Sequence, residues 1–191
     1  MSKKMRLLEM LKEKAYRKGK FTLSSGKESE HYINCKPVTL DGEGLSLIST
    51  LLLPLLEWDT KAVAGLTLGA DPLVSAVAMK SYEFWQTVND GKIILSPVAV
   101  SSTGLIIRKE PKGHGTLSQI EGDLPPTGTK VTVLEDVVTT AGSSLKAVKV
   151  LRSVGYVVES VVAIVDRMEN HQTWIDNNIE FHSLFLLDEI T

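Results

Sequence analysis

Two adjacent carboxylates, Glu135 and Asp136, stand where an apolar run gives way to a turn of small and hydroxyl residues. The stretch is Val131–Ser144, with the sequence VTVLEDVVTTAGSS. Carboxylates repel a phosphate, but they accept hydrogen bonds from the hydroxyls of a sugar. The residues of Thr139–Ser143 are small enough for backbone N–H groups to approach an anion, and their hydroxyls add further donors. A ligand that carries both ribose and phosphate is therefore implied.

This acidic pair, Glu135 and Asp136, needs a strand before it and a helix after the turn. The run Val131–Leu134 is apolar or β-branched and follows a turn cluster, which predicts a central strand of a parallel sheet. Apolar residues recur at helical spacing over Leu145–Leu151, and the positive N-terminus of such a helix favours an anion. The alternative is an ordinary strand, turn and helix with a solvated acidic tip.

A second group of charges lies in the basic segment Arg108–His114, which Gly113 and Gly115 loosen. A mobile loop of this kind can close over a site, exclude water and stabilise the negative charge that builds on a leaving pyrophosphate. The alternative is a solvated hairpin whose charges keep the protein soluble. Its combination with the acidic pair favours a catalytic loop.

The rest of the chain alternates between predicted helices and strands. Helices are expected over Met5–Gly19, Asp41–Trp58 and Pro72–Trp85, and strands over Lys20–Leu23, His31–Cys35, Ala62–Leu66, Ile93–Val98, Gly104–Lys109 and Val157–Val165. Pro54 should kink or end the second helix, and Asp71 should cap the third. The first two strands form a small hairpin. The remaining alternation implies a mostly parallel central sheet with helices on both faces, an α/β fold.

Length and charge limit the possible classes of protein. A chain of 191 residues fits one α/β domain, in which residues 1–40 form the helix and hairpin and residues 41–191 the core. The net charge of −2 gives no general attraction to nucleic acid or to an anionic membrane. Cys35 is the single cysteine, so no internal disulfide forms. The charged stretch Met1–Phe21 has no continuous apolar core, which is typical of a cytoplasmic protein.

The stretch Val131–Ser144 resembles the signature of the type I phosphoribosyltransferases, which bind phosphoribosyl pyrophosphate (PRPP). The resemblance implies their fold, with a small hood-like N-terminal segment and a flexible catalytic loop. It implies that the acidic pair holds the ribose and that the turn after it cradles the 5′-phosphate. Gly65–Asp71 resembles the pyrophosphate-binding loop. The implied PRPP-binding residues are Leu68, Gly69, Arg108, Glu135, Asp136, Val137, Val138, Thr139, Thr140, Ala141, Gly142 and Ser143.

Other stretches resemble the orotate phosphoribosyltransferases in particular. The basic segment is similar to their catalytic loop, and Phe21–Gly26 with Tyr32–Asn34 is similar to a wall of their orotate pocket. Arg167 would meet the orotate carboxylate, because a guanidinium matches a planar carboxylate; the alternative is a surface ion pair with Asp166 or Glu169. The resemblance implies orotate binding by Ser24, Tyr32, Ile33, Thr140 and Arg167, and catalysis by Lys109, Lys112, His114 and Asp136.

The implied reaction transfers the phosphoribosyl group of PRPP to N1 of orotate, giving orotidine 5′-monophosphate and pyrophosphate in pyrimidine (UMP) biosynthesis. Catalysis would be electrostatic, with His114 able to donate a proton to pyrophosphate. Mg²⁺ would be carried by PRPP and water, without a direct protein ligand. The resemblance further implies a homodimer whose catalytic loop reaches the neighbouring subunit's site, with no nucleic-acid or membrane partner.

This chain departs from the family pattern in its first acid, which is Glu135 and not Asp, and in two lysines, because members often place lysine at Ser24 and some place it at Gly69. Their absence shifts stabilisation of the pyrophosphate toward Arg108, Lys109, Lys112 and a metal. Two other functions stay open. The acceptor could be a different nucleobase, or the protein could be a non-catalytic PRPP-sensing regulator, which should carry a basic surface or a DNA-binding module.

Overall fold

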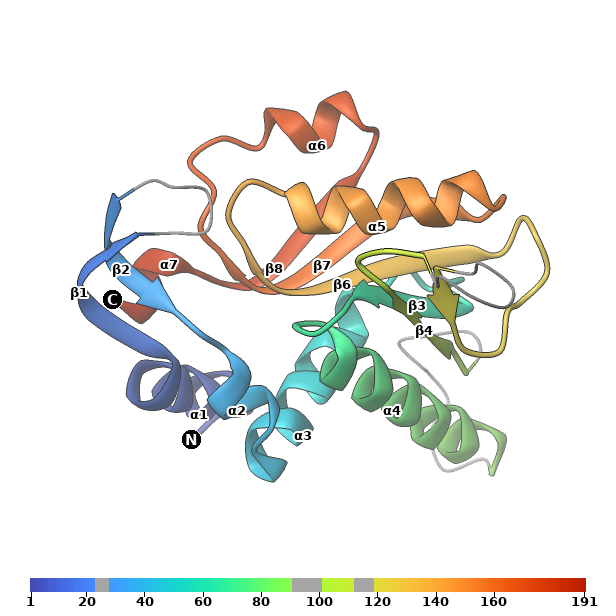
Figure 1. Ribbon diagram of the computed structural model, residues 1–191. Coiled ribbons are helices and arrows are strands. Elements are labelled where there is room, and N and C mark those ends of the chain that lie inside the picture. The colour runs from blue at the N-terminus through green and yellow to red at the C-terminus, as the bar shows by residue number, and fades with distance from the viewer. Residues whose placement is uncertain (23–27, 91–100, 112–118) are drawn as a thin grey trace.

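The computed structural model describes residues 1–22, 28–90, 101–111 and 119–191 (Figure 1). Its core is a sheet in which the described residues form six strands: β3 (Ala62–Leu66), β4 (Thr103–Ile107), β5 (Ile120–Glu121), β6 (Lys130–Val138), β7 (Val157–Asp166) and β8 (Glu180–Leu186). Their order is β5-β4-β3-β6-β7-β8. Only β5 pairs antiparallel within this sheet as described, so the prediction of a mostly parallel sheet is confirmed. The predicted strand Ile93–Val98 lies outside the described residues.

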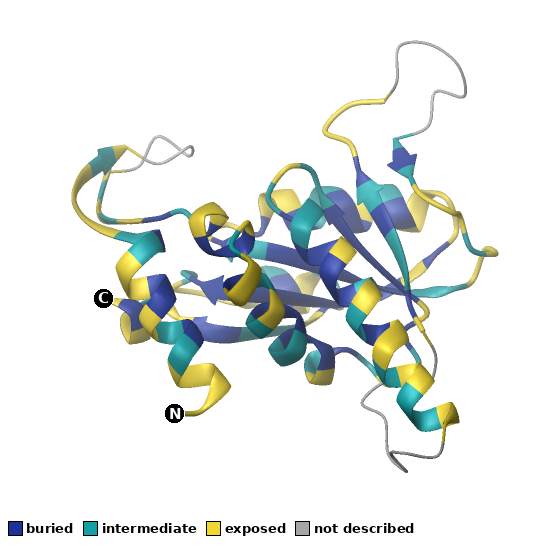
Figure 2. Cartoon of the chain, turned by 90° about the horizontal axis from the view of Figure 1, so that it is seen from below, coloured by how far each residue is buried: buried dark blue, intermediate teal, exposed yellow. Residues whose placement is uncertain are grey.

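Helices cover both faces of the sheet (Figure 1). On one face lie α3 (Gly42–Leu52), the 3₁₀ turn η2 (Leu53–Leu55) and α4 (Asp71–Asn89); on the other lie α5 (Gly142–Ser153) and α6 (Gln172–Asp176). Because both faces are covered, the centre of β7 is apolar without alternation, and every residue of Val161–Val165 is fully buried. Figure 2 shows the buried strands behind helices whose outer faces are exposed. None of the described helices is long and apolar enough to cross a membrane.

The N-terminal segment packs beside the sheet as α1 (Lys3–Met10), a π-helical turn η1 (Leu11–Ala15), the hairpin strands β1 (Tyr16–Thr22) and β2 (Glu28–Ile33), and α2 (Lys36–Thr39). The predicted hairpin is confirmed. The helix prediction to Gly19 was wrong, because Tyr16 already pairs with Ile33 in the hairpin ladder and the helical part ends at Ala15. Buried Leu7, Met10 and Leu11 fix this segment to the core.

The prediction for Pro54 and the prediction for the cap of α4 had different outcomes. Pro54 ends the regular part of α3, as predicted, and lies in the 3₁₀ turn. Asp41 caps α3, since its Oδ1 accepts a hydrogen bond from the Gly44 N–H at 3.0 Å. Asp71, however, is the first residue of α4 and Ala70 is its N-cap, so the prediction of an Asp71 cap was wrong by one residue. The Asp71 carboxylate instead accepts a hydrogen bond from the Thr67 hydroxyl at 2.8 Å.

Three elements that follow β7 were not predicted from the sequence. Strand β8 extends the sheet beside β7, α6 covers it, and α7 (Leu187–Ile190) follows β8. Trp174 of α6 is buried and stacks on Phe181 of β8, with ring centroids 4.8 Å apart. This edge supports the carboxyl end of β7, where Asp166 and Arg167 lie.

Candidate functional site

A cavity of about 580 Å³ lies at the carboxyl ends of β6 and β7, and we refer to it as the hairpin cavity. Its walls come from the hairpin, the turn after β6 and the segment after β7. The residues that line it include Glu28, Ser29, His31, Thr139, Thr140 and Arg167. In open α/β sheets, ligands bind at this carboxyl edge of the strands. The fold therefore places the hairpin over the part of the sheet where a ligand is expected.

A second cavity of about 260 Å³, the glycine-loop cavity, lies at the ends of β3 and β6. It is lined by the loop after β3, by the acidic pair and by two lysines. Its lining includes Lys36, Leu68, Gly69, Lys109, Asp136 and Ser143. Three motifs that are far apart in the sequence therefore meet here: the acidic pair, the glycine loop and the first part of the basic segment.

The two members of the acidic pair have different surroundings. Glu135 is only 5% exposed, and its Oε2 accepts hydrogen bonds from the hydroxyls of Ser143 at 2.6 Å and Ser144 at 3.2 Å. Burial, followed by the neighbouring charge of Asp136, raises the pKa of the Glu135 carboxyl from 4.5 to about 7. Asp136 is partly exposed, and its Oδ1 accepts the Val137 N–H at 2.9 Å. Glu135 thus ties β6 to the first turn of α5, whereas Asp136 faces the cavity.

The turn Thr139–Ser143, the phosphate turn, has the backbone shape of an anion site. Ala141 is in the left-handed conformation, with φ of 61°, and forms the N-cap of α5 without a side-chain hydrogen bond. The N–H groups of the first helical turn have no acceptor within the helix. Successive amides in such a turn point toward one concave face and bind anions. Thr139 and Thr140 are exposed, so their hydroxyls are open to the hairpin cavity.

Gly69 lies directly against Asp136. A Cβ built at residue 69 would approach Asp136 Oδ1 to 2.8 Å, which is closer than real Cβ contacts allow. The absence of a side chain here therefore lets the glycine loop and the carboxylate share one small space. The preceding peptide bond, Thr67–Leu68, is cis.

Arg167 joins the sheet to the hairpin. Its Nη2 donates hydrogen bonds to the His31 carbonyl at 3.1 Å and to the Ser29 hydroxyl at 3.3 Å, while its buried Nε has no partner in the described structure. The alternative of a surface ion pair is wrong for Asp166, because that buried carboxylate bonds to His171 Nε2 at 2.7 Å and to the Met168 N–H at 2.8 Å. Arg167 therefore lines the hairpin cavity with a guanidinium that has no carboxylate partner among the described residues.

Three residues of β2, Glu28, Ser29 and His31, line the hairpin cavity. Ser29 and His31 lie on the side of Arg167, and sequence reasoning missed both, although their two-residue spacing was the available signal. Tyr32 stacks on Phe21 with ring centroids 5.2 Å apart, and Ile33 is buried in the core. Neither residue lines the hairpin cavity, and their role in binding orotate stays a prediction.

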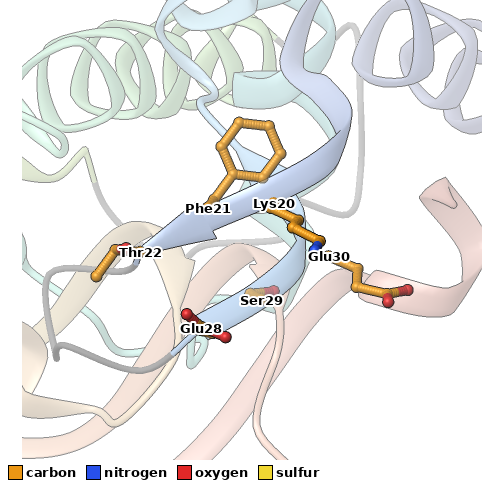
Figure 3. Close-up of a pocket in the computed structure, with 6 residues that line it drawn as sticks. All are labelled: Lys20, Phe21, Thr22, Glu28, Ser29 and Glu30. Atoms are coloured by element: carbon orange, nitrogen blue, oxygen red, sulfur yellow. The ribbon is translucent and has the colours of Figure 1, made fainter.

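A hollow of about 240 Å³ also lies within the hairpin itself, and Figure 3 shows its lining. Phe21 projects from β1 to the side opposite Glu28 of β2, so the hollow has an aromatic and an acidic wall (Figure 3). Glu28 and Ser29 line both this hollow and the hairpin cavity, so the two cavities lie next to each other along β2.

The basic segment is described only up to Pro111. Arg108 pairs with Glu121 at 3.4 Å, and Glu110 pairs with Lys146 of α5 at 3.0 Å. Lys109 lines the glycine-loop cavity, as its predicted role requires. The three remaining predicted residues, Ser24, Lys112 and His114, lie outside the described residues.

The described residues contain no cluster of three or more His, Cys, Asp or Glu side chains that would hold a metal ion. The acidic pair nevertheless fits Mg²⁺, because this ion is held by one or two carboxylates, substrate phosphates and water. Asp136, which faces the glycine-loop cavity, is the member placed to do so.

This ligand edge, the phosphate turn and the hood-like hairpin define a type I phosphoribosyltransferase. Comparison with solved structures agrees, since the phosphoribosyltransferase of Corynebacterium diphtheriae superposes with a TM-score of 0.77 at 34% identity, over 100% of this chain and 99% of that one. Orotate phosphoribosyltransferase of Mycobacterium tuberculosis in complex with PRPP gives a TM-score of 0.72 at 29% identity, over 99% of both chains. No family model matches the chain.

Sequence comparison is more specific. The chain is 49% identical over 186 residues to the orotate phosphoribosyltransferase of Thermosynechococcus vestitus, which covers 96% of this chain and 90% of that protein. The chain therefore belongs to the orotate phosphoribosyltransferase family, a family of pentosyltransferases. The resemblance, fold class and enzyme class predicted from the sequence are confirmed.

Proposed function

We propose that the two cavities bind PRPP and orotate side by side, so that the phosphoribosyl group passes from pyrophosphate to N1 of orotate and gives orotidine 5′-monophosphate. The observation that carries this proposal is the position of Arg167. Arg167 lines the hairpin cavity together with Thr139 and Thr140 of the phosphate turn, and its buried Nε has no hydrogen-bond partner in the described structure. A base that bears a carboxylate is the acceptor that such a guanidinium selects.

PRPP would span the two cavities. The phosphate turn binds the 5′-phosphate, Asp136 accepts hydrogen bonds from the ribose hydroxyls, and the pyrophosphate lies in the glycine-loop cavity beside Lys109. Support comes from the lining of that cavity by both Lys109 and Asp136. Glu135, which is buried and bonded to two serines, acts mainly by holding the first turn of α5 in place.

The reaction breaks the bond between C1 of the ribose and the pyrophosphate oxygen and forms the bond from C1 to N1 of orotate. Positive charge develops on the ribose ring and negative charge on the pyrophosphate. Fixed charges that match this pattern lower the barrier without reorganisation. Asp136 lies on the ribose side and Lys109 on the pyrophosphate side, joined in the proposal by Lys112 and His114. Bound Mg²⁺ would add positive charge at the pyrophosphate and ribose oxygens.

The proposal includes a homodimer in which the basic segment completes the partner's site. It also includes one domain over residues 1–191, which is supported by the bonds from Arg167 of the core to the hairpin. A cytoplasmic location stays a prediction. Sedimentation of the purified protein at assay concentration tests the dimer, and a monomer with full activity would contradict the shared loop.

A spectrophotometric assay tests the reaction. The protein is incubated with PRPP, Mg²⁺ and orotate, and in parallel with uracil, hypoxanthine or adenine. We expect turnover of orotate alone, because the other bases lack the carboxylate that Arg167 would bind. Turnover of another base without turnover of orotate would contradict the proposal. Binding of PRPP without turnover of any base would favour the regulator.

A further inference from the structure

We propose that Lys36 binds the pyrophosphate group of PRPP, as a cation that lines the glycine-loop cavity together with Lys109 of the basic segment. The inference rests on the proposed function and adds a residue that no motif of the sequence identified. Lys36 lines the same small cavity as Lys109, Gly69 and Asp136. A pyrophosphate placed beside Lys109 is therefore within the space that Lys36 also borders.

The backbone of Lys36 is firmly placed while its side chain is exposed. Cys35, the preceding residue, is fully buried, and Lys36 begins α2, whose Val38 and Thr39 are buried. The Lys36 N–H donates a hydrogen bond to the Asn34 side chain at 3.2 Å. The base of the side chain is thus fixed, and the ammonium group is free to reach a ligand.

The ammonium group of Lys36 has no ion pair or hydrogen bond with any residue in the described part of the chain. Two other cations near the site are engaged, Arg108 with Glu121 and Lys146 with Glu110, whereas Lys109, like Lys36, has no ion pair with a described residue. Asp136 and Lys36 both act on the buried Cys35 thiol, with the carboxylate raising its pKa and the ammonium lowering it. Both charged groups therefore lie near Cys35, and both line the glycine-loop cavity.

The charge balance of the cavity requires such a cation. The acidic pair contributes negative charge to its wall, and a pyrophosphate would bring several more negative charges into the same space. A Cβ at residue 69 would meet Asp136 Oδ1 at 2.8 Å, so a side chain there would have to displace this carboxylate. Lys36 supplies positive charge at the same cavity.

A cation fixed before the reaction begins binds the pyrophosphate group in substrate, transition state and product alike. Such uniform binding lowers KM for the group that is bound and leaves kcat nearly unchanged. Lys36→Met should therefore raise KM for PRPP and weaken pyrophosphate binding by about tenfold, the usual effect of losing a hydrogen bond to a charged group. The KM for orotate should stay the same.

The test compares Lys36→Met, Lys36→Arg and a control, Lys61→Met. Lys61 is exposed at the amino end of β3, on the opposite edge of the sheet. Steady-state assays with PRPP and orotate give the KM and kcat values, and calorimetric titration with magnesium pyrophosphate gives binding without turnover. We expect weaker pyrophosphate binding and a higher KM for PRPP in Lys36→Met only, with Lys36→Arg close to wild type.

The titration separates the two proposals. If wild-type protein does not convert orotate, the proposed function fails, and pyrophosphate titration of the variants still tests Lys36. Equal pyrophosphate affinity and equal KM for PRPP in Lys36→Met and Lys61→Met would overturn the role of Lys36. So would a Lys36→Arg variant as impaired as Lys36→Met, because a positive charge alone should then have restored binding.

Discussion

At the scale of single residues, the structure divides an acidic pair that the sequence presents as equivalent. Glu135 lies on the α5 side of β6, buried and bonded to two serine hydroxyls, while Asp136 lies on the other side, against the glycine loop. Alternation along a strand sends neighbouring side chains to opposite faces, so the two acids differ in burial and in partners although both line the glycine-loop cavity. A carboxylate that is buried with serines holds structure, and one that faces a cavity can meet a ligand.

Glu135 should make the stability of the ligand-free protein depend on pH. Its folded-state pKa of about 7 lies above the ordinary 4.5, so between these values the folded protein holds a proton that the unfolded chain releases. The free energy of unfolding should therefore fall as pH rises from about 4.5 to 7, by up to roughly 3 kcal/mol. Urea denaturation of wild type and Glu135→Gln at pH 5 and pH 8 measures this difference.

The Glu135→Gln variant should lose the decrease between pH 5 and pH 8, because its amide does not titrate. Glu13→Gln, at an exposed position on η1, serves as the control and should keep the wild-type pH dependence. An identical pH dependence in wild type and Glu135→Gln would show that Glu135 has an ordinary pKa in the folded protein.

Arg167 should govern the choice of base. Lys is not an adequate replacement, because it cannot present a planar pair of donors to a carboxylate. Arg167→Lys is expected to raise KM for orotate by about tenfold or more and to leave KM for PRPP nearly unchanged. Steady-state kinetics with each substrate varied in turn measure both values. A rise in KM for PRPP without a rise in KM for orotate would contradict the role of Arg167 in binding orotate.

At the scale of elements, the segment after β7 is held by a buried carboxylate. Asp166 accepts the Met168 N–H with one oxygen and pairs with His171 through the other, so it fixes the backbone segment that contains Arg167 and forms a closure there. Asp166→Asn keeps only one acceptor and should loosen this closure. We expect a higher KM for orotate and a loss of stability of about 1–3 kcal/mol, typical of a disrupted buried polar group.

The control for Asp166→Asn is Glu180→Gln, which removes an exposed carboxylate from a pair with His182 on β8. An exposed pair of this kind contributes little, so both stability and KM should stay within error of wild type. The closure by Asp166 would be refuted by an Asp166→Asn variant that loses stability without any change in KM for orotate.

The sequence predicted elements well where one local pattern decides them. The strand Ala62–Leu66 agrees at both ends, because a short apolar run between turns leaves few choices. The boundary at Tyr16 was missed, because the pairing of Tyr16 with Ile33 spans residues far apart in the chain and overrides the local helical spacing. Lys36 and His31 were missed for the same reason, since only the fold brings them to the cavities.

At the scale of the whole molecule, the two edges of the sheet have separate tasks. The carboxyl edge carries the acidic pair, the phosphate turn and the glycine loop. At the amino edge, Lys130 of β6 pairs with Glu57 at 3.2 Å, Asp59 at 3.3 Å and Glu159 at 3.2 Å. These three carboxylates belong to the segment before β3 and to β7, so one cation joins three neighbouring parts of the sheet.

This separation predicts opposite effects of mutations at the two edges. Lys130→Met leaves three carboxylates close together without their cation, which should lower the free energy of unfolding by about 1–3 kcal/mol at neutral pH. Activity at a temperature where the variant is folded should stay near wild type, since Lys130 is remote from both cavities.

Asp136→Asn should have the opposite effect, with reduced catalysis and nearly unchanged stability. The amide still accepts the Val137 N–H but interacts more weakly with a ribose diol and with Mg²⁺. Denaturation curves and kcat/KM for PRPP, measured on both variants, test whether the two edges have separate roles. A loss of catalysis in Lys130→Met with intact stability would mean that the amino edge also serves the reaction.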